Sequence, residues 1–133
     1  MTTVIAVCEA PFDFDLAKTL TERTVREAKP TQSLVWVAVK ERLFIKWSDL
    51  TKVMRDLRVK PRQGHFDGKP GKPDAAAARN ALHVVREWSK ANPTDVVILL
   101  RDADDQPERR TGLEQARHTK PLDATVIISS RRS

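Results

Sequence analysis

Acidic residues follow directly on an apolar run in the second half of the chain. The run is Val96–Leu100, and Asp102, Asp104 and Asp105 come just after it. Residues two apart in an extended segment point the same way, so Asp102 and Asp104 are expected to share a ligand. Clustered carboxylates repel one another unless a cation lies between them or their pKa values shift. Because Mg²⁺ and Mn²⁺ prefer oxygen ligands, this spacing predicts a site for one of these ions.

An acidic residue stands at the equivalent place after another apolar run. Glu9 follows Val4–Cys8, and Asp13 lies four residues further on. If the two runs form neighbouring parallel strands, Glu9 and Asp102 meet at the carboxyl edge of the sheet, where such folds place their sites. A divalent ion held there would activate water and hold a phosphate for in-line displacement. The alternative is that Asp102 and Asp104 are turn formers and helix caps, which leaves the position of Glu9 unexplained.

Four apolar runs rich in β-branched residues predict the strands that position these acids. They are Val4–Cys8, Leu34–Val39, Val96–Leu100 and Thr125–Ser129. Each is almost continuously apolar, which is typical of strands covered on both faces, as in a parallel sheet. Helical patterns lie between them, at Phe14–Lys29, Trp47–Leu57, Asp74–Lys90 and Pro107–His118. The alternation predicts an α/β fold with a four-stranded parallel sheet and flanking helices, in a Rossmann-like arrangement.

Charged residues are also expected at the ends of these elements. Asp74 is a good N-cap for the third helix, and Asp13 or Asp15 would open the first. Arg101 is unusual, because it stands directly before the acidic stretch at a strand position that is more often apolar. Its guanidinium can pair with a carboxylate of the site and partly replace the charge of a metal ion.

The chain carries 24 Lys and Arg against 18 Asp and Glu, a formal net charge of +6. This balance favours polyanionic partners, nucleic acid first, although solubility alone also explains it. The stretch 60–73 is rich in Gly, Pro and basic residues and is expected to be a loop, either functional or merely solvated. The residues expected to guide a phosphate backbone are Lys60, Arg62, His65, Lys69, Lys72, Arg109, Arg110 and Arg117. Arg109 and Arg110 are equally compatible with a solvated helix face.

Several classes of protein are excluded or disfavoured. Cys8 is the only cysteine, so an internal disulfide and a Cys-based zinc cluster are impossible, and Cys8 itself is expected in the core. The sequence contains no P-loop motif. It has neither the basic start of a signal peptide nor an apolar run of the roughly 18 residues that a membrane helix needs. We therefore expect a cytoplasmic protein with no membrane partner.

The order of these features resembles the Toprim domain, the metal-binding module of topoisomerases, primases and overcoming-lysogenisation-defect (OLD) nucleases. An acidic residue after the first strand and D-x-D after the third are shared, over roughly residues 3 to 129. The sequence is most similar to the small OLD-like proteins, in which a second acid follows the first Glu by four positions, as Asp13 follows Glu9. The stretches GHFDGKPGKPDAAAARNAL and RDADDQPERRTGLEQAR look like a small bacterial Toprim-like group that is often encoded beside ATPases of phage-defence systems.

This resemblance implies a single Toprim-like domain over residues 1–133 and a Mg²⁺-dependent or Mn²⁺-dependent nuclease subunit. Glu9 would be the general base or a metal ligand, Asp102 and Asp104 would be metal ligands, and Asp13 a further one. Asp105 has no counterpart. The implied partners are nucleic acid and an ATPase of the ABC or AAA type in antiviral defence, and a homo-oligomer is compatible with them.

The resemblance also implies a departure at the C-terminal end. The nuclease-active relatives continue past the fourth strand with more site residues and another helix, whereas this chain stops at Ser133. We therefore expect a C-terminally truncated domain. The alternative function is a catalytically inactive Toprim-like interaction module that docks on a larger partner.

Overall fold

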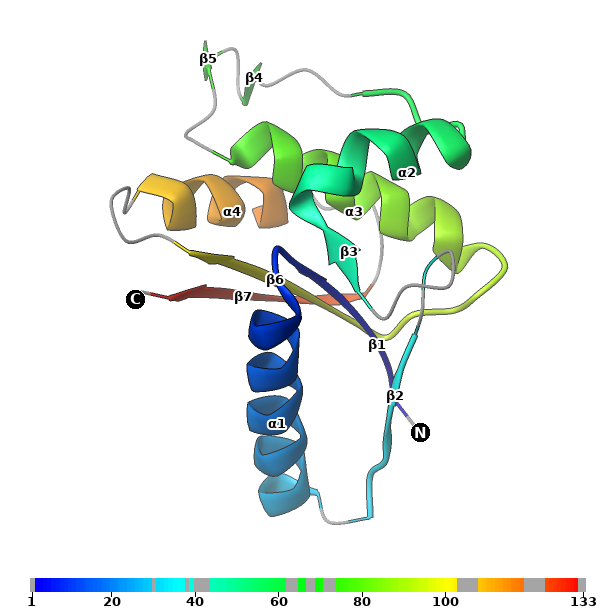
Figure 1. Ribbon diagram of the computed structural model, residues 1–133, viewed down its shortest axis with the longest axis vertical. Coiled ribbons are helices and arrows are strands. Elements are labelled where there is room, and N and C mark those ends of the chain that lie inside the picture. The colour runs from blue at the N-terminus through cyan, green and yellow to red at the C-terminus, as the bar shows by residue number, and fades with distance from the viewer. Residues whose placement is uncertain are drawn as a thin grey trace.

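A parallel sheet forms the centre of the computed structural model (Figure 1). Its strand order is β2–β1–β6–β7, with β3 paired to β1 beyond the end of β2. The strands are β1 (Thr2–Cys8), β2 (Leu34–Trp36), β3 (Ile45–Lys46), β6 (Val96–Asp102) and β7 (Thr125–Arg131). All four pairings, β1–β2, β1–β3, β1–β6 and β6–β7, are parallel. The predicted α/β class and parallel sheet are confirmed.

The structure describes residues 2–29, 31–37, 39, 44–61, 65–66, 69–70, 74–102, 108–118 and 124–131. Within these ranges it describes the backbone alone for residues 65–66, 69–70, 102, 109 and 129–131. No helix in the described ranges is long and apolar enough to span a membrane.

Helices cover the two faces of the sheet unequally. The helices α2 (Leu50–Asp56), α3 (Ala75–Ser89) and α4 (Glu108–His118) lie on one face, which is the upper one in Figure 1. The helix α1 (Pro11–Ala28) lies on the other face and runs away from the strands at a steep angle. A 3₁₀ turn, η1 (Trp47–Asp49), leads from β3 into α2. The main core is therefore between the sheet and the three upper helices.

The alternation of side chains along the strands explains this core. Ile5 and Val7 of β1 and Val97 and Leu99 of β6 belong to the large buried cluster that includes residues of α2, α3 and α4. The residues between them in sequence face α1, where a much smaller cluster forms around Phe14. Continuous apolar character along each strand thus reflects helices on both sides of the sheet, as the sequence predicted.

The structure differs from the predicted elements in several details. The sheet has a fifth strand, because two residues, Ile45–Lys46, continue the edge where β2 has ended at Trp36 instead of Val39. A strand of two residues is too short to produce a recognisable pattern. A second short sheet lies within the predicted loop, where β4 (His65–Phe66) pairs antiparallel with β5 (Lys69–Pro70).

The start of the first helix also differs from its prediction. The helix α1 begins at Pro11 with Ala10 at the N-cap, so neither Asp13 nor Asp15 caps it. Proline suits the first turn, because the backbone N–H that it lacks would have no partner inside the helix. Asp13 is thereby placed inside the first turn of the helix, four positions after Glu9.

Candidate functional site

The two strands expected to carry the site are neighbours. The strands β1 and β6 pair in parallel from Val4↔Val96 to Val7↔Leu99. Glu9 follows β1 directly, and Asp102 is the last residue of β6. The sequence-predicted adjacency is confirmed. The Asp102 side chain, Asp104 and Asp105 lie outside the described part, so the expected convergence of Asp102 and Asp104 with Glu9 stays a prediction.

An open cavity of about 420 Å³ lies beside this edge of the sheet. Its walls come from the ends of β1 and β6, from η1 and from the first turns of α1 and α3. The residues that line it are Glu9, Asp13, Trp47, Ser48, Asp74, Ala77, Leu100 and Arg101. Two of the four predicted metal ligands, Glu9 and Asp13, therefore share one cavity with Arg101.

Arg101 is the centre of this group. Its Nε donates a hydrogen bond to Asp74 Oδ2 at 3.2 Å, and its Nη1 lies 3.8 Å from Glu9 Oε2. The Arg101 side chain is 22% exposed, whereas those of Asp74 and Glu9 are 15% and 48% exposed. A partly buried guanidinium between two carboxylates is more weakly screened than a surface ion pair. The expectation that Arg101 pairs with a carboxylate of the site is confirmed.

Trp47 fixes the other side of Arg101. The guanidinium carbon lies 5.6 Å from the centre of the Trp47 ring, within the range of a cation–π contact. The indole Nε1 donates a hydrogen bond of 2.8 Å to the backbone oxygen of Leu100. Leu100 comes directly after Leu99, the last β6 residue that pairs with β1. The hydrogen bond from Trp47 therefore connects η1 to β6 at the point where β1 and β6 stop pairing. The Trp47 indole therefore holds η1 against β6 and forms part of the cavity wall.

Glu9 accepts a hydrogen bond from Ser48, and its carboxylate is accessible to solvent. The backbone N–H of Ser48 donates a hydrogen bond of 3.3 Å to Glu9 Oε2, the same oxygen that faces Arg101. Its carboxylate is about half exposed. A carboxylate with one restrained oxygen and access to solvent is suited to accept a proton from a water molecule or to bind a cation.

Asp74 is a residue of this site that the sequence analysis placed only as a helix cap. It occupies the N-cap position of α3, but its side chain makes no capping hydrogen bond and instead accepts from Arg101. Its backbone has φ 68° and ψ −4°, in the left-handed region that is uncommon for residues other than glycine. Asp is among the residues that tolerate this region. No local pattern links Asp74 to Arg101, because 27 positions separate them.

The acids of the cavity also affect a buried thiol. Burial raises the pKa of Cys8 to about 12, and the negative charges of Asp13 and Glu9 contribute in the same direction. Cys8 is buried in the small cluster around Phe14, as the sequence analysis expected. The thiol is therefore protonated at neutral pH, which makes it a poor nucleophile and a poor metal ligand.

Metal binding can be tested against the described side chains. In the described ranges, no group of three or more His, Cys, Asp and Glu side chains could hold a metal ion. Glu9 fits one position of such a site by its oxygen donors and its place in the cavity. The remaining ligands would have to include Asp102 and Asp104. Asp74 is already engaged by Arg101.

The predicted nucleic-acid contacts are only partly described. Lys60 is exposed shortly after α2, and Arg110 lies on α4 within 3.9 Å of Glu114, which also pairs with Arg117. These ion pairs on α4 agree with the alternative of a solvated helix face. Arg62 and Lys72, together with the side chains of His65, Lys69 and Arg109, lie outside the described part.

Comparison with models of protein families, with curated proteins and with solved structures found no match.

Proposed function

We propose that this chain is a Toprim-like, Mg²⁺-dependent nuclease subunit that hydrolyses phosphodiester bonds in nucleic acid. The observation that carries the proposal is the pairing of β1 with β6, which brings Glu9, directly after β1, to the same edge of the sheet as Asp102, the last residue of β6. Sites of open parallel sheets lie beyond such strand ends. The 420 Å³ cavity beside this edge gives a substrate phosphate room to enter.

Each side chain of the cavity has a role in this proposal. Glu9 accepts the proton of the attacking water, because its carboxylate reaches solvent while Ser48 N–H and Arg101 restrain one oxygen. Glu9, Asp102 and Asp104 would hold the cation, with Asp13 as a further ligand. Bound Mg²⁺ or Mn²⁺ would supply charge stabilisation at the phosphate. The basic residues of 60–73 and of α4 would guide the nucleic-acid backbone.

The proposed setting is a phage-defence complex with an ATPase of the ABC or AAA type. The support is the resemblance of GHFDGKPGKPDAAAARNAL and RDADDQPERRTGLEQAR to proteins encoded beside such ATPases. The net charge of +6 favours nucleic acid as the other partner.

A cleavage assay tests the proposed activity. Supercoiled DNA, linear DNA and RNA are incubated with the protein and Mg²⁺ or Mn²⁺, both alone and with the product of the neighbouring gene. Glu9→Gln should lower the rate by about 10²–10⁴-fold, the usual contribution of a general base. Glu27→Gln is the matched control, because Glu27 is an exposed residue of α1 that pairs with Arg23 at 3.5 Å and does not line the cavity. Equal rates for both variants would exclude Glu9 from the reaction.

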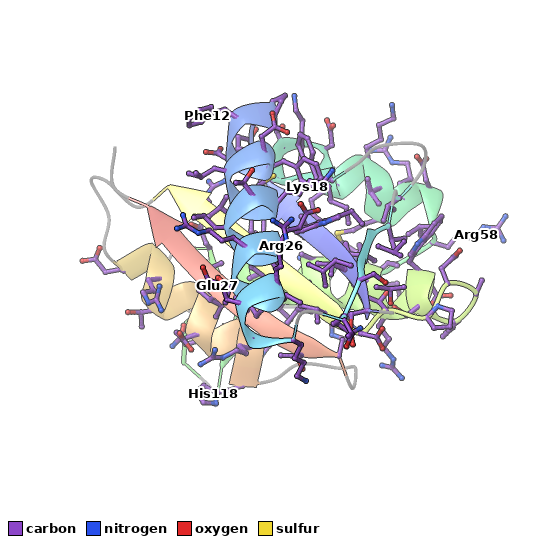
Figure 2. The ribbon with its side chains drawn as sticks, turned by 90° about the horizontal axis from the view of Figure 1, so that it is seen from below. Phe12, Lys18, Arg26, Glu27, Arg58 and His118 are labelled. Carbon is purple, nitrogen blue, oxygen red and sulfur yellow. The ribbon has the colours of Figure 1, made fainter. Side chains whose placement is uncertain are left out.

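The second candidate function is a catalytically inactive Toprim-like interaction module. Apolar side chains exposed on the α1 side of the sheet favour it, namely Phe12, Leu16, Leu20 and Ile127. Figure 2 shows this side, with α1 crossing the sheet and Phe12 pointing away from it. A cavity of about 560 Å³ opens between α1 and the strands β6 and β7. Exposed apolar groups of this kind are typical of surfaces that contact another protein.

The two candidates differ in their response to two substitutions. Leu20→Asp should abolish co-purification with the ATPase partner if α1 is the docking surface, and Glu9→Gln should leave it intact. Thr19→Asp is a matched control, because it introduces the same charge on the same exposed helix. Cleavage by wild type that Glu9→Gln removes would rule out an inactive module.

A further inference from the structure

The helix α1 is poorly buried for its length. All 18 of its residues are described, and of these only Phe14 is buried, whereas the 15 residues of α3 include six that are buried. The apolar side chains of Leu16 and Leu20 are 37% and 53% exposed. Helices in proteins are stabilised mainly by packing of an apolar face against other elements. The helix α1 therefore lacks a packing contact that the described part of the chain does not supply.

The exposed leucines of α1 lie beside an apolar groove over β6 and β7. A cavity of about 560 Å³ forms this groove, and its lining includes Leu16, Leu20, Ile98, Ile127 and Ile128. The helix is one wall and the two strands are the floor. In Figure 2 no other described helix lies over β7 on this side of the sheet. Because parallel sheets are normally covered by helices on both faces, the groove is a place for a second helix beside α1.

The helix α1 has the apolar face and the charges that such a second helix requires. Leu16 and Leu20 are four residues apart and so lie on the same face of α1. Its first turn contains the acidic Asp13 and its last turn the basic Arg26. When two copies of this helix lie side by side and antiparallel, the acidic turn of each is next to the basic turn of the other, and their dipoles are oppositely directed. A two-fold axis perpendicular to the helices produces this arrangement.

We propose that the α1 side of the sheet binds a second copy of this chain, so that each α1 fills the groove beside β7 of the other copy. In an antiparallel arrangement centred between Leu16 and Leu20, each Leu16 contacts the partner's Leu20. The strip that is covered is about 27 Å long and about 20 Å wide, which is on the order of the 800 Å² per partner of a standard interface. The inference goes beyond the nuclease function and assigns this face to a homodimer instead of an ATPase.

Light scattering after size-exclusion chromatography tests the dimer at about 100 μM protein, where a complex with a micromolar Kd is almost fully associated. The wild type should have twice the 15.1 kDa mass of the chain. Leu20→Asp should have the mass of the monomer, because it places a charge in an apolar interface. Thr19→Asp is the matched control and should remain a dimer, because Thr19 is exposed on α1 and lies outside the groove lining.

Two outcomes of this measurement would overturn the inference. A monomeric wild type would leave the groove to a partner of another kind. A dimer that Leu20→Asp leaves intact, with the variant folded by circular dichroism, would place the interface elsewhere on the chain. Neither outcome depends on cleavage activity, so the homodimer and the nuclease proposal are tested separately.

Cross-linking decides the question if Leu20→Asp does not fold. Leu20→Cys introduces a reactive thiol on α1, whereas Cys8 is buried and its pKa is raised to about 12, so Cys8 should not react. A short bis-maleimide should convert most of Leu20→Cys to a covalent dimer. Lys52→Cys, on an exposed position of α2 on the other face of the sheet, should stay largely monomeric. Equal cross-linking of the two variants would contradict the proposed interface.

Discussion

The substitution Trp47→Phe tests the hydrogen bond from the Trp47 indole to the backbone oxygen of Leu100, at the wall of the cavity. Phenylalanine keeps an aromatic ring against Arg101 but removes the indole N–H that donates to the Leu100 oxygen at 2.8 Å. A buried acceptor that loses its donor costs about 1–3 kcal/mol. The smaller ring also leaves a space in the cluster to which Trp47 belongs. We expect a total loss of about 2 kcal/mol in the free energy of unfolding.

Urea denaturation followed by circular dichroism measures this loss. With an m value of about 2 kcal/mol per M, the midpoint should fall by roughly 1 M without a change in m. A double-mutant cycle of Trp47→Leu with Arg101→Gln then isolates the ring–guanidinium contact, which should contribute about 0.5–1 kcal/mol. A midpoint for Trp47→Phe within error of the wild type would refute the hydrogen bond. A coupling energy of zero would refute the stacked arrangement of Arg101.

Further predictions concern two groups outside the ion-paired centre. The pKa of Cys8 is raised to about 12, so the folded state holds the thiol proton more tightly than the unfolded state does. The resulting stabilisation is complete below the ordinary pKa near 9 and is lost as the pH rises toward 12. Cys8→Ala should show a flatter decline over that range in urea titrations, and a decline equal to the wild type would contradict the prediction. Backbone and side-chain hydrogen bonds from Thr3 lower the pKa of Asp95, so its contribution is present above the ordinary value near 4 and lost in acid. Asp95→Asn should therefore be less stable than wild type at neutral pH, with a difference that shrinks as pH falls in the same titration. A difference that stays constant down to pH 2 would contradict it.

The strands were predictable because burial on both faces leaves a local signature. The runs Val4–Cys8, Val96–Leu100 and Thr125–Ser129 each fall inside an observed strand. The helix predicted at Asp74–Lys90 also matches α3 within one residue at each end. These elements depend on periodicity and apolar character alone, which the sequence contains. The same periodicity and apolar character also predicted the parallel sheet and placed Glu9 at its carboxyl edge.

The contacts of the site were less predictable, because they depend on tertiary structure. The sequence suggested that Arg101 would pair with an acid, but its principal partner proved to be Asp74, which had been interpreted as a cap. Trp47 was predicted at the start of a helix, whereas it lies in a 3₁₀ turn and its indole donates to the backbone oxygen of Leu100 in β6. Strand order and loop path decide such pairs, and neither is encoded in local spacing.

The central claim is that a divalent cation binds at the carboxyl edge of β1 and β6. The most direct measurement is an anomalous difference map from crystals grown with Mn²⁺. A peak should lie at this edge, with an oxygen of Glu9 about 2.0–2.6 Å from it and Arg101 still paired to Asp74. A map with no peak at this edge, or with a peak that Glu9 does not contact, would contradict the account.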